Sequence, residues 1–355
     1  MILDELFLNP LSVNLEYVFK EVASSWEFLR NKKIFLTGGT GFFGCWFLET
    51  FICAVEKLNL NARVTVLTRN KDLFIQKYPK FGIHTAIDFY LGDVTNFTFP
   101  DQKFSYVIHA ATETAGLGRL KPKETLNTIV QGTQRVLDFA VYSGVTNFLF
   151  ISSGAVYGVQ PPDVMRLHEN HSINLKPNDI NSYGIGKFTA EHLCHLYQTI
   201  SNIKIKIARC FTFIGPFFPL NSHFASSHFF QNGLDGKPIV VTGNRYTYRS
   251  YMHAADLMIW LWQILFLGSA GRPYNVGSSE AITIFEFANL VAKYSPYRSE
   301  VIFKNNFSEV ISRYIPDVER ASNELKLKQQ ITIEDSIKST FNWYQGQAQP
   351  TLVEA

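Results

Sequence analysis

Short, almost continuously apolar runs alternate with longer amphipathic stretches in the first part of the chain. The runs are rich in β-branched and aromatic residues, and they predict strands at residues 34–36, 64–67, 106–110, 148–152 and 205–208. Between them, apolar positions recur at helical spacing, as in residues 45–55 and 182–199. Strands without polar alternation that are separated by helices are typical of a parallel sheet covered on both faces. The pattern therefore predicts an α/β fold with a doubly wound parallel sheet.

The apolar pattern loosens after Cys210, where glycine and proline become frequent, and helical spacing returns at residues 251–267 and 283–294. We expect four parts: an N-terminal helical extension, a sheet domain, a smaller C-terminal lobe and a tail, at residues 1–31, 32–210, 211–345 and 346–355. The lobe is expected to be interleaved with the sheet domain, because part of residues 240–277 should return to that domain.

The N-terminal extension precedes the first predicted strand. Its apolar residues recur at helical spacing, at Leu15, Val18, Phe19, Val22, Trp26 and Leu29. A helix with one apolar face has to cover that face. We expect it to pack on the body of the protein, and a contact between subunits is the alternative.

Composition narrows the class of protein. The 355 residues are 46% hydrophobic, enough for a large core, and the net charge is only +3 with scattered basic residues, which argues against a nucleic-acid surface. The four cysteines have neither metal-ligand spacing nor a disulfide framework, so we expect no metal and a reducing, cytoplasmic setting. No signal peptide and no apolar run of membrane-spanning length is found, and no membrane association is expected.

A glycine-rich segment follows the first predicted strand and leads into a helix; it reads Thr37-Gly38-Gly39-Thr40-Gly41-Phe42-Phe43-Gly44. Glycines let the backbone turn tightly and approach a pyrophosphate, which the amide groups and dipole of the helix N-terminus stabilise. This context indicates a Rossmann dinucleotide site. We expect it to be formed by Gly38, Gly41, Phe42, Phe43 and Gly44.

The end of the second predicted strand bears on the choice of dinucleotide. In NAD enzymes of this fold, an acidic residue near this place accepts hydrogen bonds from the ribose 2′-hydroxyl. This chain has Arg69 instead, whose guanidinium suits a 2′-phosphate, so NADP is favoured over NAD. The alternative is that Arg69 stacks on the adenine or faces solvent. Further on, Asp93 and Val94 are expected beside the adenine, and a plain turn at Gly92-Asp93-Val94 is the alternative.

Two sequence elements together suggest acid–base chemistry. Tyr183 and Lys187 are four residues apart at a helix start, so their side chains lie on one face, one turn apart. A nearby ammonium stabilises a phenolate, and we expect it to bring the Tyr183 pKa toward neutrality, while Lys187 also binds the nicotinamide ribose. Ser153, preferred here over Ser152, follows a predicted strand at the sheet edge where ligands bind, and it can hydrogen-bond the reacting oxygen.

These elements resemble the extended short-chain dehydrogenase/reductase family, in its branch of nucleotide-sugar epimerases, dehydratases and reductases. Besides the glycine segment, Ser153 and the Tyr183–Lys187 pair, the matching landmarks are His109-Ala110-Ala111, Arg249-Ser250-Tyr251 with Asp256, and Tyr274-Asn275-Val276-Gly277. The resemblance implies that Ala110 and Ala111 line the cofactor site, that the C-terminal lobe binds a nucleotide-diphosphate sugar, and that Arg249 contacts its diphosphate. It also implies a homodimer, paired through helices beside the Tyr–Lys helix, and a role in polysaccharide biosynthesis.

The chain departs from the family pattern at several positions. Sugar 4,6-dehydratases of this branch place an aspartate–glutamate pair where this chain has Gly154 and Ala155, and elimination of water needs that acid and base. A conventional 4,6-dehydratase is therefore disfavoured. Ile129 and Thr212 stand where relatives often carry asparagine, which puts a helix-anchoring role and a phosphate-binding role in doubt.

The resulting functional hypothesis is an NAD(P)-dependent nucleotide-sugar epimerase that transiently oxidises a sugar hydroxyl and returns the hydride. The alternative that Arg69 favours is an NADPH-dependent reductase of a nucleotide 4-keto sugar. A dehydratase or decarboxylase variant comes after these two. A non-catalytic nucleotide-binding protein is a further alternative from another class, and the intact set of Ser153, Tyr183 and Lys187 argues against it.

Overall fold

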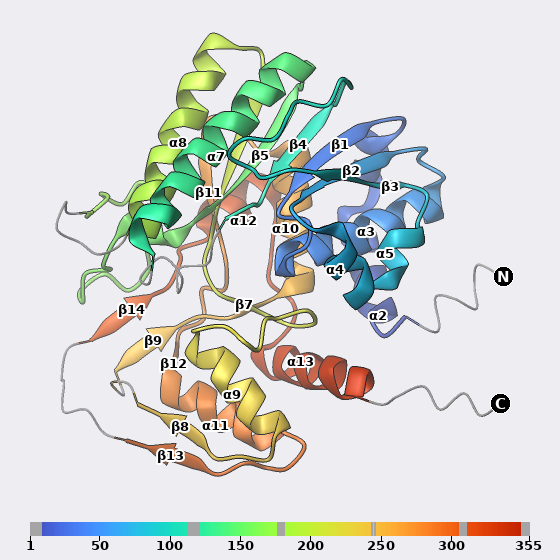
Figure 1. Ribbon diagram of the computed structural model, residues 1–355. Helices are drawn as coiled ribbons and strands as arrows, with labels where there is room; N and C mark the ends of the chain where they lie inside the picture. Colours follow the sequence, from blue (N-terminus) through green and yellow to red (C-terminus); the bar gives the residue numbers. More distant parts are fainter. Residues whose placement is uncertain are drawn as a thin grey trace, which may run out of the picture.

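The structure is a computed structural model that describes residues 9–112, 121–175, 182–242, 244, 246–304 and 311–348. Its centre is a parallel sheet of seven strands in the order β11-β6-β5-β4-β1-β2-β3 (Figure 1). The strands are β1 (Lys33–Thr37), β2 (Arg63–Thr68), β3 (Ile87–Leu91), β4 (Tyr106–His109), β5 (Asn147–Ser153), β6 (Lys204–Cys210) and β11 (Pro273–Val276). The predicted doubly wound parallel sheet is confirmed.

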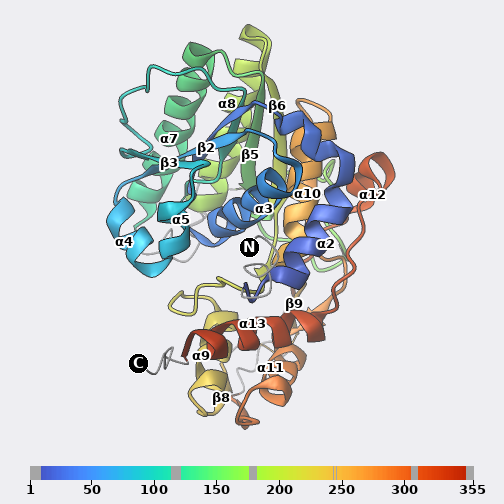
Figure 2. The same cartoon turned by 90° about the vertical axis from the view of Figure 1, so that its right-hand side faces the viewer.

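Helices cover both faces of this sheet. One face carries α7 (Pro122–Ser143) and α8 (Ser182–Ile200), and the other carries α3 (Phe42–Leu58) and α10 (Ala254–Leu267), while α4 (Lys71–Lys77) and α5 (Pro79–Ile83) lie near β3 (Figures 1 and 2). Strand β1 shows why its sequence lacks polar alternation. Phe35 packs toward α7 and α8, whereas Ile34 and Leu36 pack toward α3 and α10.

The N-terminal extension forms α2 (Ser12–Val22) and a 3-10 helix over Ala23–Leu29. Helix α2 packs on α3 and α10, and Trp26 is fully buried with its ring 5.1 Å from that of Trp262. Tyr17 donates a hydrogen bond to Asp256 Oδ1 at 2.7 Å. The helical spacing in the sequence thus covers two elements, because the α-helix ends at Ala23, which has a positive φ of 47°.

The prediction of one helix over residues 251–267 is wrong at its beginning. Residues Met252–His253 form strand β10, which pairs with β7 (Phe213–Ile214), and α10 begins at Ala254. His253 caps the helix, because its Nδ1 accepts a hydrogen bond from the Ala255 amide at 3.0 Å. Tyr251 precedes this strand and stacks on Phe287, so it is buried for a reason other than a place in the helix.

The smaller lobe lies below the sheet in Figure 1. It holds a three-stranded sheet of β12 (Ile282–Thr283), β9 (Thr247–Arg249) and β14 (Ser312–Tyr314), and the pair β8 (Ile239–Val241) and β13 (Val301–Phe303). Helices α9 (Ala225–Leu234), α11 (Ile284–Tyr294) and α13 (Ile333–Ala348) enclose a core of its own. The chain returns to the central sheet through α10 and β11, and α12 (Glu319–Leu325) packs against β11.

Two searches of the described residues bear on other classes of protein. None of the helices in that part of the chain combines the length and apolar character needed to cross a membrane. The same residues contain no group of three or more histidine, cysteine or acidic side chains arranged to hold a metal ion. All four cysteines are free and buried.

Candidate active site

The glycine segment forms a close turn between β1 and α3. Gly38 has a φ of +72°, and a Cβ there would lie 2.6 Å from the Ala110 backbone, while a Cβ at Gly44 would lie 2.4 Å from Gly38 O. At Gly41, the N-cap of α3, the nearest atom to such a Cβ is 3.5 Å away. The turn therefore needs glycine at two positions for packing, while the helix N-terminus stays open on the Gly41 side, as binding of a pyrophosphate requires.

The other predicted cofactor residues surround this turn or lie at neighbouring strand ends. The Ala110 amide donates to Thr37 O and the Ala111 amide to Thr37 Oγ1, both at 3.1 Å, which holds the end of β4 against the turn. Phe42 and Phe43 turn their rings to the lobe, against Phe218 and Phe213. The part of Phe42 and Phe43 in a cofactor site stays a prediction.

Arg69 and Asp93 lie near one another at the ends of β2 and β3. Arg69 is exposed, and its charge contributes to lowering the pKa of Asp93, whose Oδ1 accepts hydrogen bonds from the Thr95 amide and hydroxyl at 2.9 and 2.6 Å. The Asp93 carboxylate thus closes a tight turn with Thr95, and its contact with the adenine stays a prediction. Val94 is partly buried and faces Gly132 of α7.

The structure brings Ser153, Tyr183 and Lys187 together beyond the end of β5. Ser153 Oγ accepts the Ala155 amide at 3.2 Å, and its hydroxyl is near enough to the Tyr183 phenol to lower the pKa of that group. Lys187 is buried, its Nζ lies 5.9 Å from the centre of the Tyr183 ring, and it donates to Ile151 O at 2.7 Å. Helix α8 supplies the phenol and the ammonium from successive turns, and β5 supplies the hydroxyl, as the spacing predicts.

Burial changes the pKa values of Tyr183 and Lys187 more than the attraction expected between their charges does. It raises the pKa of Tyr183 to about 12, and the hydrogen bond from Ser153 only partly opposes this. Burial also lowers the pKa of Lys187 to about 8. The expectation that Lys187 brings the Tyr183 pKa toward neutrality is therefore wrong for the chain alone, because Lys187 is directed at the Ile151 carbonyl and its own charge is poorly solvated.

The Lys187 pKa predicts a pH-dependent effect on stability. Below about pH 8 the folded chain bears the full cost of a buried ammonium, and between about 8 and the ordinary value of 10.5 the folded chain loses this proton before the unfolded chain does. Lys187→Met removes the cost of the buried charge but also the hydrogen bond to Ile151 O. We expect the net result to be a rise in the free energy of unfolding of about 1–3 kcal/mol at pH 7. Denaturant titrations at pH 7 and 9.5 should show this gain shrinking; a gain that is independent of pH would contradict the assignment.

Tyr314 and Phe211 also belong to the site, and the sequence did not single them out for it. Tyr314 Oη lies 3.4 Å from Ser153 Oγ, and its ring stacks on Phe211 with centres 4.7 Å apart. The Phe211 ring fills the space beside Gly154, where a Cβ would lie 2.6 Å from it. Phe211 and Tyr314 thus form an aromatic wall next to Ser153, at the place where the sequence pattern of 4,6-dehydratases has an acidic side chain.

Two other positions that depart from the family pattern have packing roles. Ile129 is buried and faces Gly186 of α8, where a Cβ would come within 3.2 Å of it, so an apolar contact joins α7 to the Tyr–Lys helix. Thr212 accepts the Met252 amide through its carbonyl oxygen at 3.1 Å, which joins the lobe strands.

Arg249 lies beside Tyr314, because these two residues are opposite one another in the β9–β14 pairing. Its Nη1 donates to Tyr248 O at 2.7 Å and to Ser312 Oγ at 3.5 Å, and burial lowers its pKa. No ion pair within the described part of the chain includes this guanidinium. A half-buried cation without a carboxylate partner is suited to an anionic ligand.

A buried ion pair joins the Tyr–Lys helix to the central sheet. Glu191, two turns after Tyr183 on α8, accepts three hydrogen bonds from Arg209 of β6, at 3.0, 3.2 and 2.7 Å, and one from the Ser152 hydroxyl at 2.5 Å. Only 7% of either charged side chain is exposed. The pair therefore fixes α8 to both strands next to the site.

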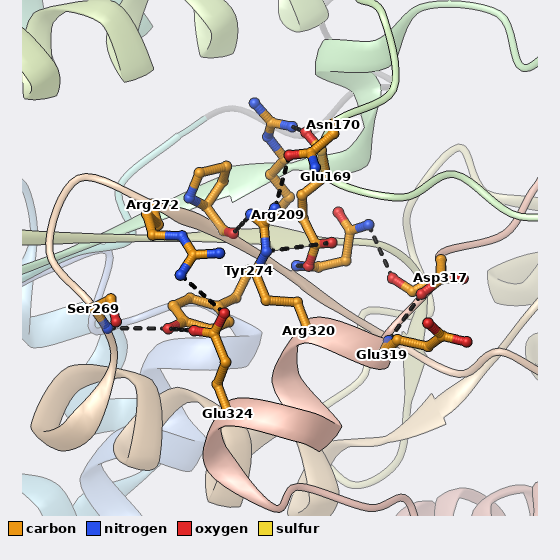
Figure 3. Close-up of polar contacts among 12 residues, drawn as sticks. Glu169, Asn170, Arg209, Ser269, Arg272, Tyr274, Asp317, Glu319, Arg320 and Glu324 are labelled. Atoms are coloured by element: carbon orange, nitrogen blue, oxygen red, sulfur yellow. Dashed lines mark hydrogen bonds and ion pairs between the residues drawn. The ribbon is translucent and has the colours of Figure 1, made fainter.

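Arg209 is also part of a second polar cluster, which Figure 3 shows. Its Nη1 donates to Glu169 O, and the Glu169 carboxylate accepts the Asn275 amide at 2.9 Å and lies 3.8 Å from Arg320. Arg320 also donates to Pro273 O at 2.7 Å. These contacts fix α12, and with it the segment that follows Tyr314, to β11 of the central sheet.

Comparisons with known proteins agree with this geometry. Residues 34–277 match the family model described as the NAD dependent epimerase/dehydratase family. UDP-glucuronic acid decarboxylase 1 of Danio rerio is 24% identical over 316 residues, which cover 88% of this chain and 72% of that protein. An epimerase structure from Methanothermobacter thermautotrophicus has a TM-score of 0.79 at 21% identity and covers 92% of this chain and 96% of that one.

The structure of UDP-glucose 4-epimerase from Thermotoga maritima is also similar, with a TM-score of 0.77 at 19% identity, covering 89% of this chain and 100% of that one. Both structural likenesses show a shared fold. The family model covers most of the chain and includes the glycine turn, Ser153 and the Tyr183–Lys187 pair, which confirms the resemblance stated from the sequence. The chain belongs to the NAD dependent epimerase/dehydratase family.

Proposed function

We propose that this protein is an NAD(P)-dependent epimerase of a nucleotide-diphosphate sugar. The observation that carries the proposal is the juxtaposition of Ser153, Tyr183 and Lys187 with an aromatic wall at Gly154. Tyr183 exchanges the proton of a sugar hydroxyl, and Ser153 hydrogen-bonds the same oxygen. Elimination of water needs an acid and a base at neighbouring carbons, and Gly154 and Ala155, which directly follow Ser153, supply neither.

The cofactor residues fit a dinucleotide. The open N-terminus of α3 would hold the pyrophosphate, the ends of β2 and β3 with Arg69 and Asp93 would lie beside the adenosine, and Lys187 would hold the nicotinamide ribose. The bound nicotinamide supplies hydride acceptance and return. Arg69, exposed at the end of β2, supports NADP over NAD.

Arg249 is proposed to bind the diphosphate of the sugar nucleotide. Its guanidinium is half-buried at the lobe side of the site, and its only hydrogen bonds within the described residues are to a carbonyl and a hydroxyl. The two phosphates would supply the missing negative charge. The lobe thus holds the nucleotide while the sheet domain carries the reacting groups.

Identification of a retained nucleotide tests the function directly. We expect the purified protein, once denatured, to release a nicotinamide dinucleotide in near-stoichiometric amount, because an epimerase regenerates its cofactor in each turnover. Mass spectrometry of the released material gives its identity, and a third phosphate would show NADP. Recovery of an empty protein that oxidises added NADPH with a 4-keto sugar nucleotide would instead favour the reductase.

We also propose that the protein is a homodimer paired through α7 and α8. The outer face of these helices carries exposed apolar side chains, at Val141, Tyr142, Phe188, Leu196 and Ile200. Light scattering should give twice the mass of one chain, and Phe188→Glu combined with Leu196→Glu should give the mass of one. Leu73→Glu, an exposed position on α4, is the matched control; a wild-type monomer would refute the proposal.

A further inference from the structure

Ser153 has two phenols as neighbours but only one hydrogen to give. Its oxygen accepts the Ala155 amide at 3.2 Å and lies 3.4 Å from Tyr314 Oη, and its hydroxyl is near enough to Tyr183 to lower the pKa of that phenol. A serine hydroxyl has one donor hydrogen and two acceptor sites. With one acceptor site used, one phenol must receive the Ser153 hydrogen and the other must donate into the remaining site.

The surroundings decide which phenol receives that hydrogen. Tyr183 is one helical turn from the Lys187 ammonium and is the phenol that takes negative charge during proton exchange. Tyr314 is opposite Arg249 in the β9–β14 pairing, and a nearby cation makes a phenol a better donor. The arrangement that serves a Tyr183 phenolate is therefore Tyr314 to Ser153 to Tyr183.

We propose that Tyr314 is a positioning residue of the proton-exchange site, which donates its hydrogen to Ser153 Oγ and thereby directs the Ser153 hydrogen to Tyr183. This inference rests on the proposed role of Tyr183. The separation of 3.4 Å is longer than the usual 2.7–2.8 Å for hydroxyl pairs, as is common at catalytic sites without substrate. The contact is expected to tighten when Tyr183 carries charge.

The fold holds Tyr314 in place from the residues that follow it. The Ile315 amide donates to Gln160 Oε1 at 3.0 Å, and its carbonyl accepts the Leu167 amide at 2.9 Å. The Asn275 side chain then donates to Asp317 O at 3.0 Å, next to the Arg320 contacts of Figure 3. The backbone next to Tyr314 is thus fixed to the segment that follows Ser153.

The test places 3,5-difluorotyrosine at position 183 of the full chain and follows its ionisation by ¹⁹F NMR between pH 6 and 10. The fluorinated phenol is more acidic than tyrosine, which brings the titration into a range where the chain stays folded. We expect Tyr314→Phe, which keeps the ring on Phe211, to raise the pKa at position 183 by about one unit, the size of one hydrogen bond. Tyr248→Phe on the neighbouring strand is the matched control and should leave it unchanged.

A double variant separates a role through Ser153 from a packing role. We expect Ser153→Ala to raise the pKa at position 183 by at least as much as Tyr314→Phe, and Ser153→Ala with Tyr314→Phe to give no further rise. An unchanged pKa in Tyr314→Phe, or effects that add in full, would overturn the proposal. The titration uses neither cofactor nor sugar nucleotide, so its result is independent of whether the chain proves to be an epimerase.

Discussion

Turnover is expected to fall by about 10²–10⁴-fold in Tyr183→Phe, while cofactor binding persists. Phenylalanine keeps the buried ring and removes only the oxygen that exchanges a proton with the sugar hydroxyl. Ser153 and Lys187 remain, so the nicotinamide ribose keeps its expected partner on α8. The measurements are kcat with the sugar nucleotide that the wild type converts, and the dissociation constant of NADP⁺ or NAD⁺ by calorimetry.

A second tyrosine of the same helix is the matched control for this result. Tyr197 lies about four turns further along α8 and is hydrogen-bonded to Asp138 of α7, away from the site. Tyr197→Phe should keep turnover near the wild-type value. If Tyr183→Phe lost cofactor binding together with turnover, a structural role would replace the catalytic one. Unchanged biological activity in Tyr183→Phe would point to a non-catalytic nucleotide-binding protein.

The largest expected effect on stability comes from the Glu191–Arg209 pair. Removing one partner of a buried pair leaves the other charge without compensation, at a cost of about 3–5 kcal/mol. We expect Arg209→Met to lower the free energy of unfolding by about this amount, because among the described residues Glu191 then keeps a hydrogen bond only from the Ser152 hydroxyl. Denaturant titration near pH 7 measures the change.

Two further variants show whether burial is the cause. Arg209→Met combined with Glu191→Leu removes both charges and should recover most of the loss. The exposed Arg63–Asp88 pair has a similar separation of 2.7 Å with 47% of each side chain exposed, and Arg63→Met should cost less than about 1 kcal/mol. Equal losses at the two pairs would contradict the argument from burial.

Local patterns were sufficient to find the glycine turn and the helix of the candidate site. Helical spacing places Tyr183 and Lys187 on one face, and Ser153 at the end of a predicted strand gave that pair its significance. The turn follows from glycines between an apolar run and a helix. The parallel sheet could be predicted because its strands are apolar on both faces, as Phe35 and its two neighbours show.

Tyr314 and Phe211 could not be predicted because their roles depend on contacts between distant segments. Tyr314 reaches Ser153 from 161 residues further along the chain, through the pairing of β14 with β9. The run from Arg313 to Ile315 has no spacing that separates a site residue from a core residue. Gly154 gives part of the information in the sequence, because it shows that an acidic side chain is missing there. It does not show that an aromatic ring fills the space.

The direction in which the Tyr183 pKa shifts could not be predicted from the sequence either. Spacing shows that an ammonium is one turn away, but the effect of that ammonium depends on which acceptor it faces and how much water surrounds it. Here the acceptor is Ile151 O, and the group is fully buried. Only the packing of α8 on β5 reveals that.

The contact between the N-terminal extension and α10 has a consequence for the order in which the chain can fold during synthesis. Tyr17 and its partner Asp256 are separated by 239 residues. At about 5–20 residues per second, the ribosome completes that distance in roughly 12–48 s. Throughout this interval α3 can already pack on α2 whereas α10 is absent, so Trp26 lacks its partner Trp262 and the side of α2 that faces α10 stays uncovered.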